Sequence, residues 1–326
     1  LRVLRVIKGL MDRGAHVELI AGNRDVALLA ALVHVGRKDP RLAHLLARMG
    51  ARAVRMLVEV FDQYLVEDWG VRRDFLGARE QPRIREMLLP DETWYLDFPD
   101  ESASFLNQAQ IQRELGRLRE RLGELEQTID ECGLSLAQLH AAIEQARDLF
   151  LEPEGEFAWF FQRLQVAARH GSCVVVHAGF DDEMAALLED GGVEAVNARF
   201  TQMLDRNLFE LYYGPVGNLF RTRYRDDDYP MTEAGWASLR RAGVLAIIHG
   251  HGVGVDQVRL GIKGGLLDIA CDMGMDRVTR GRQSVRARGG GAVVVGADGR
   301  IEAVCAGHTH ARVFDPAAYA GLMTVA

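Results

Sequence analysis

The pattern of apolar positions predicts helices at the start of the chain and in its middle. From Leu1 to Arg13 the apolar side chains share one helical face, and Gly14 ends the pattern. Between residues 106 and 150, apolar positions alternate spacings of four and three, which is the a/d seam of a heptad repeat. The seam consists of Ile111, Leu115, Leu118, Leu122, Leu125 and Ile129. A capping box of Ser135 and Gln138 then starts a second helix over residues 136–150.

These features predict a helical hairpin over residues 106–150, inserted into a larger domain. Two interpretations of the hairpin stay open. The first is an ordinary helix pair that packs on its own domain, because a seam of fewer than about four heptads is weak evidence for a free coiled coil. The second is a coiled-coil lid or dimer arm, through which the chain would form a homo-oligomer.

Short apolar runs between helical segments predict the strands of a sheet. The predicted strands cover residues 16–21, 173–176, 244–248, 266–271, 292–295 and 301–305. Asp298 and Gly299 are a hairpin turn between the last two. The order of helices and strands is typical of an α/β fold. We divide the chain into the first part of a domain (1–100), a helical insertion (101–170) and the second part of the domain (171–326).

The composition of the chain bears on its binding partners and on its cellular compartment. A net charge of -7 gives no footprint for binding nucleic acid, and no apolar stretch reaches the length of a membrane span. None of the four cysteines forms a C-x-x-C pair, which favours a reducing, cytoplasmic setting. The chain opens at Leu1 within a helical pattern, so we expect a fragment of a longer protein.

Chemistry is concentrated in three loops that each follow a predicted strand. They are Gly22-Asn23-Arg24-Asp25, His177-Ala178-Gly179 and Gly250-His251. Glycine lets the backbone turn sharply beside a ligand, and a strand end is a rigid platform. An asparagine oxygen and neutral imidazoles suit Mn, Fe, Zn or Ni. The loops therefore predict a metal site at the rim of the sheet, with Asn23, His177 and His251 as ligands.

The order of these loops resembles the calcineurin-like metallophosphoesterases. The segment Val174 to Met184 is similar to the VHGG-type motif of the serine/threonine phosphatase and diadenosine-tetraphosphatase branch, as is the stretch 250–276. The likeness covers residues 1–25 and about 171–285. It implies a two-sheet α/β sandwich flanked by helices, with two divalent metal ions at the strand ends. In such sites a metal-bridged hydroxide attacks phosphorus, and Asn23, His177 and His251 would hold the second ion.

This chain departs from the family pattern in ways that bear on activity. The family begins with D-x-H and GD-x-x-D, which are absent here, so the first-metal ligands are missing from this chain. Arg24 replaces the usual histidine and, staying charged, cannot act as a general acid. It can bind a phosphate oxygen, with Asp25 orienting it, and GNRD resembles the UDP-diacylglucosamine hydrolase branch.

Alternatives stay open for several side chains. A GHTH sequence that contains His308 and His310 also follows a predicted strand, although the residues downstream of His251 fit the family better. His249 is either a phosphate contact or an ordinary polar group at a strand end. In the cluster of Arg221, Arg223 and Arg225, Arg223 is our choice for binding phosphate, and the alternative is a solvated loop.

The sequence thus predicts a metallophosphoesterase that acts on a phosphorylated small molecule or a phosphoprotein. The alternative is a catalytically dead relative that serves as a binding or scaffold module through the hairpin. A Rossmann-like nucleotide binder is disfavoured because no G-x-G-x-x-G follows a strand.

Overall fold

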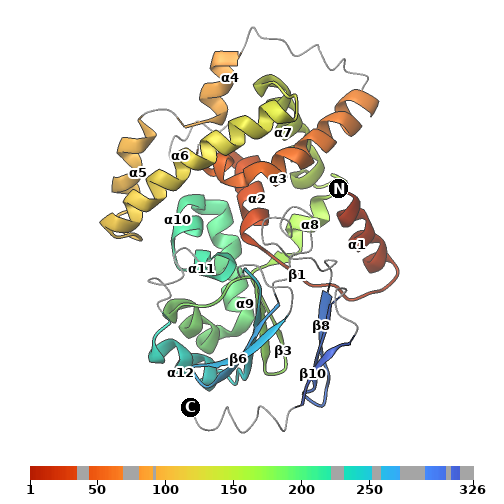
Figure 1. Ribbon diagram of the computed structural model, residues 1–326, viewed down its shortest axis with the longest axis vertical. Helices are drawn as coiled ribbons and strands as arrows, with labels where there is room; N and C mark the ends of the chain where they lie inside the picture. The colour runs from red at the N-terminus through yellow and green to blue at the C-terminus, as the bar shows by residue number, and fades with distance from the viewer. Residues whose placement is uncertain are drawn as a thin grey trace. The chain divides into compact units, whose positions relative to one another are not determined.

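The computed structural model has a mixed α/β architecture and divides into two compact units (Figure 1). It describes residues 1–34, 44–68, 81–90, 93–221, 231–251, 258–271, 291–305 and 310–315. Unit 1 comprises residues 1–19, 23–164 and 203–214, and unit 2 comprises residues 20–22, 165–202 and 215–326. Within the described ranges, every helix falls short of the length and apolar character that crossing a bilayer requires.

Unit 1 is built from helices. They are α1 (Arg2–Asp12), α2 (Asn23–His34), α3 (His44–Val60), the π-helix η2 (Phe61–Asp68), α4 (Gln81–Leu88), α5 (Trp94–Ser102), α6 (Gln108–Glu131), α7 (Leu136–Leu151), α8 (Ala158–Gln162) and α10 (Leu208–Tyr213). Gly50 interrupts α3 with φ 75°. A left-handed backbone is strained for residues that carry a Cβ, so glycine suits this kink.

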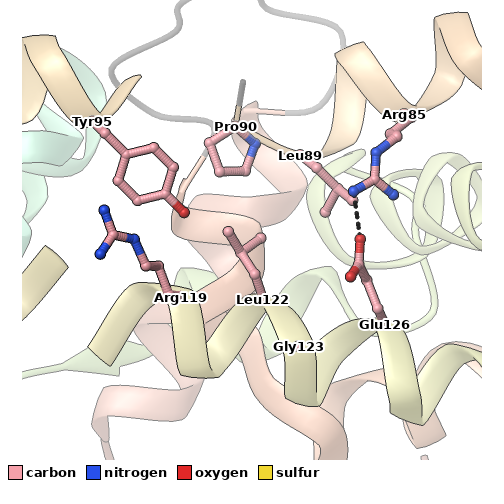
Figure 2. Close-up of a pocket in the computed structure, with 8 residues that line it drawn as sticks. All are labelled: Arg85, Leu89, Pro90, Tyr95, Arg119, Leu122, Gly123 and Glu126. Carbon is pink, nitrogen blue, oxygen red and sulfur yellow. Dashed lines mark hydrogen bonds and ion pairs between the residues drawn. The ribbon is translucent and has the colours of Figure 1, made fainter. Parts of the chain in front are cut away.

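The predicted hairpin is confirmed as α6 and α7. Asn107 caps α6 and Ser135 caps α7, and each forms a reciprocal capping box with the glutamine three residues on, Gln110 and Gln138. Most of the α6 seam is buried within unit 1, where α6 contacts α3. This favours a helix pair that packs on its own unit. Leu122 of the seam instead lines a pocket between α4, α5 and α6 (Figure 2).

A buried ion pair joins α3, α6 and α10 in unit 1. The Arg48 guanidinium donates to the Glu114 carboxylate and, over 2.6 Å, to the Tyr213 hydroxyl. The side chains of Arg48 and Glu114 are 8% and 0% exposed. Removing one member of such a pair leaves an uncompensated buried charge, at a cost of about 3–5 kcal/mol.

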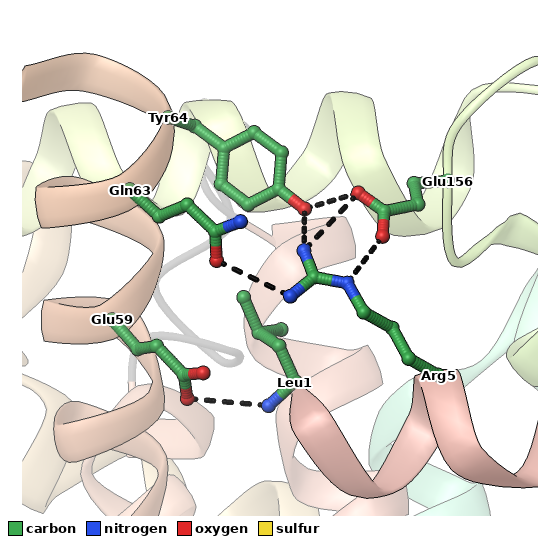
Figure 3. A network of polar contacts seen from close by, with 6 residues as sticks. All are labelled: Leu1, Arg5, Glu59, Gln63, Tyr64 and Glu156. Atoms are coloured by element: carbon green, nitrogen blue, oxygen red, sulfur yellow. Dashed lines mark hydrogen bonds and ion pairs between the residues drawn. The ribbon is translucent and has the colours of Figure 1, made fainter. Parts of the chain in front are cut away.

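Polar contacts hold α1 against the rest of unit 1 (Figure 3). Arg5 Nε donates to Glu156 over 2.7 Å, and Arg5 Nη2 donates to the Tyr64 hydroxyl over 2.8 Å. Burial, together with the hydrogen bond to Glu156, raises the pKa of Tyr64 to about 12. Burial opposes the shift at Glu156, but the hydrogen bonds from Arg5 and Tyr64 lower the pKa of its carboxyl group. Tyr64 therefore stays a neutral donor to a charged acceptor at ordinary pH.

Unit 2 contains a five-stranded sheet with the order β3-β4-β5-β7-β6. Its strands are β3 (Ala167–His170), β4 (Cys173–Val176), β5 (Ala246–His249), β6 (Arg259–Lys263) and β7 (Leu266–Ala270). The three central strands β4, β5 and β7 are parallel, while β3 and β6 run antiparallel at the edges. Helices α9 (Asp182–Arg206), α11 (Val216–Phe220) and α12 (Glu233–Arg241) complete the connections of the described part.

A three-stranded antiparallel sheet, β10-β9-β8, also belongs to unit 2. Its strands are β8 (Gly291–Val295), β9 (Ile301–Cys305) and β10 (Arg312–Phe314), and the predicted Asp298-Gly299 turn joins the first two. Ile301 and Ala303 of β9 share a buried cluster with Leu267 and Ile269 of β7. This apolar cluster links the three-stranded sheet to the five-stranded one.

Several local predictions from the sequence are wrong. The first predicted strand shrinks to β1 (Leu19–Ile20), which pairs with β2 (Leu164–Gln165). Asn23, Arg24 and Asp25 form the first turn of α2, not a loop, and an acidic residue such as Asp25 is favourable there because it faces the positive helix end. Strands β2 and β3 occupy the end of the 101–170 segment that we expected to be helical. These strands were missed because they are only two and four residues long, too short to show an alternating pattern beside the long helices.

Replacing Ser135 with alanine tests the capping box of α7. The change removes the acceptor for the Gln138 backbone N–H, 3.2 Å away, so stability should fall by about 1 kcal/mol. Urea unfolding followed by far-UV circular dichroism measures the difference. Ser104→Ala, at an exposed turn position, is the matched control and should change little. Equal losses in the two variants would contradict the assignment.

Candidate functional site

The carboxyl ends of β4, β5 and β7 meet at one edge of the five-stranded sheet, because the strands are parallel. Backbone hydrogen bonds continue the pairing past the strand ends. The Gly250 N–H donates to the His177 carbonyl over 3.0 Å, and the Cys271 N–H donates to the His249 carbonyl over 2.7 Å. These bonds fix the backbone of both histidine loops on a common edge, where α/β folds place their ligands.

His177 and His251 meet at this edge. His177 Nε2 lies 3.2 Å from His251 Nδ1, and the ring centroids are 5.2 Å apart at an angle of 65°. Both side chains are partly buried. The structure thus brings these two imidazoles together at the ends of β4 and β5, and their role as metal ligands stays a prediction.

The backbone of His251 is left-handed, with φ 54°. It is the only residue other than glycine with a positive φ in the described part of the chain. Such a conformation costs about 1–3 kcal/mol and persists only where its surroundings impose it, often at functional sites. With this backbone conformation the His251 imidazole faces His177.

Hydrogen bonds to helices α9 and α11 hold the loop that carries His177. The Ala178 N–H donates to the Leu219 carbonyl of α11 over 2.8 Å. The buried Asp181 accepts from the Met184 backbone N–H at the start of α9 over 2.8 Å and from Asn218 over 2.7 Å. Because a single carboxylate caps α9 and holds α11, the turn between β4 and α9 is rigid. His177 is thus positioned by fixed backbone on both sides.

His249, the last residue of β5, contacts a carboxylate on the neighbouring strand. Its Nε2 lies 3.0 Å from Asp268 Oδ1, and its Nδ1 lies 3.0 Å from the Gly250 carbonyl. A carbonyl and a carboxylate only accept hydrogen bonds, so the ring nitrogen that carries the proton is the donor in such a contact. The other oxygen of Asp268 pairs with Lys263 Nζ over 2.9 Å. Asp268 thus fixes the orientation of the His249 ring.

The partners of Asp268 also set its charge. Burial opposes ionisation, but the hydrogen bonds from His249 and Lys263 hold the pKa of this carboxyl below its ordinary value of 3.8. Asp268 is therefore a carboxylate at neutral pH. The ion pair of Asp268 with Lys263 offsets the buried negative charge of the carboxylate.

The spacing of the two imidazoles fits a shared metal ion. Imidazole bonds of about 2.0–2.1 Å place two ligand nitrogens roughly 2.8–3.0 Å apart at octahedral angles and roughly 3.3–3.4 Å apart at tetrahedral angles. The observed separation of 3.2 Å lies between these two ranges. In the described residues, however, no group of three His, Cys, Asp or Glu side chains is gathered that could hold an ion. Within the part of the chain that the structure describes, a site built on this pair would need a further donor of another kind, such as the amide oxygen of an asparagine.

The other predicted site residues are placed as follows. Asn23, Arg24 and Asp25 begin α2 and belong to unit 1, so their meeting with the two histidines stays a prediction. Arg223 and His308 lie outside the described residues. His310 is described and exposed.

Asp268 and Lys263 are site residues that the sequence analysis missed. A signal for Asp268 exists, because it is the single charged residue of the strand Leu266–Ala270, whose other residues are all apolar. A lone carboxylate in such a strand requires a partner to offset its burial. The partner His249 lies nineteen positions earlier in the chain, and only the parallel pairing of β5 with β7 reveals it.

Comparisons with known proteins give little beyond this geometry. No protein family matches the sequence, and neither does any curated protein. Two solved structures share a limited likeness: a cold-active protein tyrosine phosphatase (14% identity, TM-score 0.35) and its isoleucine-to-methionine mutant (15% identity, TM-score 0.36). Each likeness covers 59% of this chain and 61% or 62% of the matched one, so the chain spans about three fifths of those structures. TM-scores this low carry no argument about fold or activity.

Replacing Asp268 with asparagine tests its pairing with His249 and Lys263. At pH 7 the free energy of unfolding of the variant should be about 1–3 kcal/mol lower than that of the parent protein, because hydrogen bonds to a charged acceptor are lost. A carboxyl whose folded pKa is depressed stabilises above its unfolded pKa of about 3.9 and loses that contribution as pH falls through the folded value. The stability gap to the unmutated protein should therefore narrow at more acidic pH.

Chemical unfolding at pH 7 and pH 3 measures this gap. Asp190→Asn, at an exposed position of α9, is the matched control and should change stability little at either pH. A gap for the Asp268 variant that stays constant from pH 7 to pH 3 would contradict the assignment.

Proposed function

We propose that the protein is a metal-dependent phosphoester hydrolase whose metal is held by His177 and His251. The single observation that carries this proposal is the 3.2 Å separation of His177 Nε2 and His251 Nδ1 at the edge of a parallel sheet. Asn23, which follows β1, supplies the amide oxygen that completes the donor set. This assignment rests on the order of the three loops in the sequence.

The local physics supports a binding role for the histidine pair. At 3.2 Å two neutral imidazoles can share one N–H···N hydrogen bond, and a cation held by both ring lone pairs needs a similar spacing. The left-handed backbone of His251 adds a cost that a folding role does not explain. Strand ends also hold ligands more precisely than long loops do.

Phosphoryl transfer relies on positioning and on charge stabilisation, and the proposed residues divide these tasks. Divalent ions, when bound, neutralise phosphoryl oxygens and activate water. Arg24 contacts a phosphate oxygen through its forked guanidinium, and Asp25 orients it. His249, held by Asp268 over 3.0 Å, contacts the phosphate, and Arg223 is a further phosphate contact. The substrate is a phosphorylated small molecule or a phosphoprotein.

We also propose that unit 2 is the two-sheet sandwich of this enzyme class. The buried cluster that joins Leu267 and Ile269 to Ile301 and Ala303 supports this arrangement. Sheets that pack face to face share such an apolar layer between their inner faces. In that arrangement the metal lies at the open edge of the five-stranded sheet.

Alanine variants of the two histidines test the metal site. His177→Ala and His251→Ala should each weaken Mn²⁺ binding more than about tenfold, because even the loss of a residue behind a ligand costs 10–100-fold. Isothermal titration calorimetry measures the affinity. His170→Ala, at the exposed end of β3, is the control and should bind Mn²⁺ as the parent does. Unchanged affinity in both site variants would refute the metal assignment.

Hydrolysis of p-nitrophenyl phosphate, with and without Mn²⁺, tests the activity itself. The parent protein should require the metal, and His177→Ala should lose turnover. Equal turnover in the parent and in His177→Ala would discard the catalytic assignment. If Mn²⁺ binding alone survives in the parent, the non-catalytic binding module becomes the better description.

A further inference from the structure

A pocket of about 540 Å³ opens between α4, α5 and α6 in unit 1 (Figure 2). It is lined by Arg85, Leu89, Pro90, Tyr95, Arg119, Leu122, Gly123 and Glu126. Its volume falls within the range of about 300–1,000 Å³ that is typical of small-molecule sites. None of these residues belongs to the histidine site, which lies in unit 2.

Arg119 gives the pocket a charge that its own helix does not neutralise. Other arginines of α6 pair with glutamates three residues away, as Arg117 does with Glu114 and Arg121 with Glu124. The positions three and four residues from Arg119 are instead leucines and glycines: Leu115, Gly116, Leu122 and Gly123. Helix geometry therefore leaves this guanidinium without a carboxylate partner on α6.

Tyr95 holds the Arg119 side chain in place. The guanidinium carbon lies 5.0 Å from the centre of the Tyr95 ring, which comes from α5. Stacking on an aromatic face fixes a guanidinium while it leaves its in-plane N–H groups available as donors. Figure 2 shows Arg119 and Tyr95 together at one end of the pocket.

The rest of the lining is apolar or already paired. Leu89, Pro90 and Leu122 form the middle of the pocket, and Arg85 donates to Glu126 over 2.6 Å at the other end (Figure 2). Among the lining residues that the structure describes, two arginines and one glutamate leave one net positive charge. The described lining thus combines one guanidinium that has no ion pair on its own helix with the leucine and proline side chains beside it.

Gly123 keeps the space open. A glycine inside a helix costs roughly 0.5–1 kcal/mol relative to alanine. Gly123 lies inside α6 without a positive φ, and a Cβ added there would meet no atom within 4 Å. A larger side chain at Gly123 would therefore extend into the pocket without meeting another atom of the described chain.

We propose that this pocket binds a small organic carboxylate. The carboxylate group pairs with the N–H edge of Arg119, and its aromatic or aliphatic body lies on Leu89 and Leu122. A single negative charge matches the net charge of the lining, and a planar carboxylate matches the two parallel donors of a guanidinium. This site is separate from phosphoester hydrolysis and stands whether or not that proposal holds.

Calorimetric titration with 3-phenylpropionate tests the pocket, with 3-phenylpropionamide as the neutral ligand of the same shape. The carboxylate should bind the parent protein at least about tenfold more tightly than the amide, since hydrogen bonds to charged groups are worth about 1.5–3 kcal/mol. Arg119→Gln should remove this preference. Failure of the carboxylate to bind the parent, or equal affinity for the two ligands, would overturn the proposal.

A pair of glycine variants separates the pocket from the rest of α6. Gly123→Leu fills the cavity and should abolish binding, while helix propensity keeps the fold intact. Gly116→Leu makes the same change on the same helix, outside the lining and with no atom within 4 Å, and should bind as the parent does. Circular dichroism establishes that each variant is folded. Unchanged binding by a folded Gly123→Leu protein would place the ligand elsewhere and refute the site.

Discussion

The parallel pairing of β4, β5 and β7 is the constraint on which the histidine site depends. Parallel strands deliver their carboxyl ends to one edge, so residues 74 positions apart in the chain come within 3.2 Å. The backbone hydrogen bond from Gly250 to the His177 carbonyl carries the ladder one step past the strands. A shift of the register by one residue would turn His249 away from Asp268 and separate the two facing imidazoles.

The sequence predicted local elements where periodicity or capping chemistry was strong. The α6–α7 hairpin and the strand Cys173–Val176 follow from patterns of a few neighbouring residues. Short edge strands such as β3 and β10 were missed because three or four residues carry too little alternation to stand out from their surroundings. Their place is set by pairing with strands that are distant in sequence.

The candidate site shows the same division. Each histidine lies in a glycine-containing loop after a buried strand, and this pattern alone predicted that His177 and His251 lie close together. It could not reveal Asp268, because a carboxylate inside a strand becomes informative only when its cross-strand neighbour is known. It also misplaced Asn23 to Asp25, since the residues that suit a tight loop, asparagine and aspartate, equally suit the first turn of a helix.

The interlaced path of the chain has a consequence for how this protein can be taken apart. The stretch 203–214 lies in sequence between two portions of unit 2, yet its Tyr213 completes the buried Arg48–Glu114 pair of unit 1. Neither half can be excised as one continuous polypeptide without cutting that tie. Gene fusions, truncations or circular permutations that separate the helical half from residues 203–214 should then expose apolar core residues and yield proteins that aggregate. Recombination during evolution would meet the same barrier, so the two halves should be inherited together.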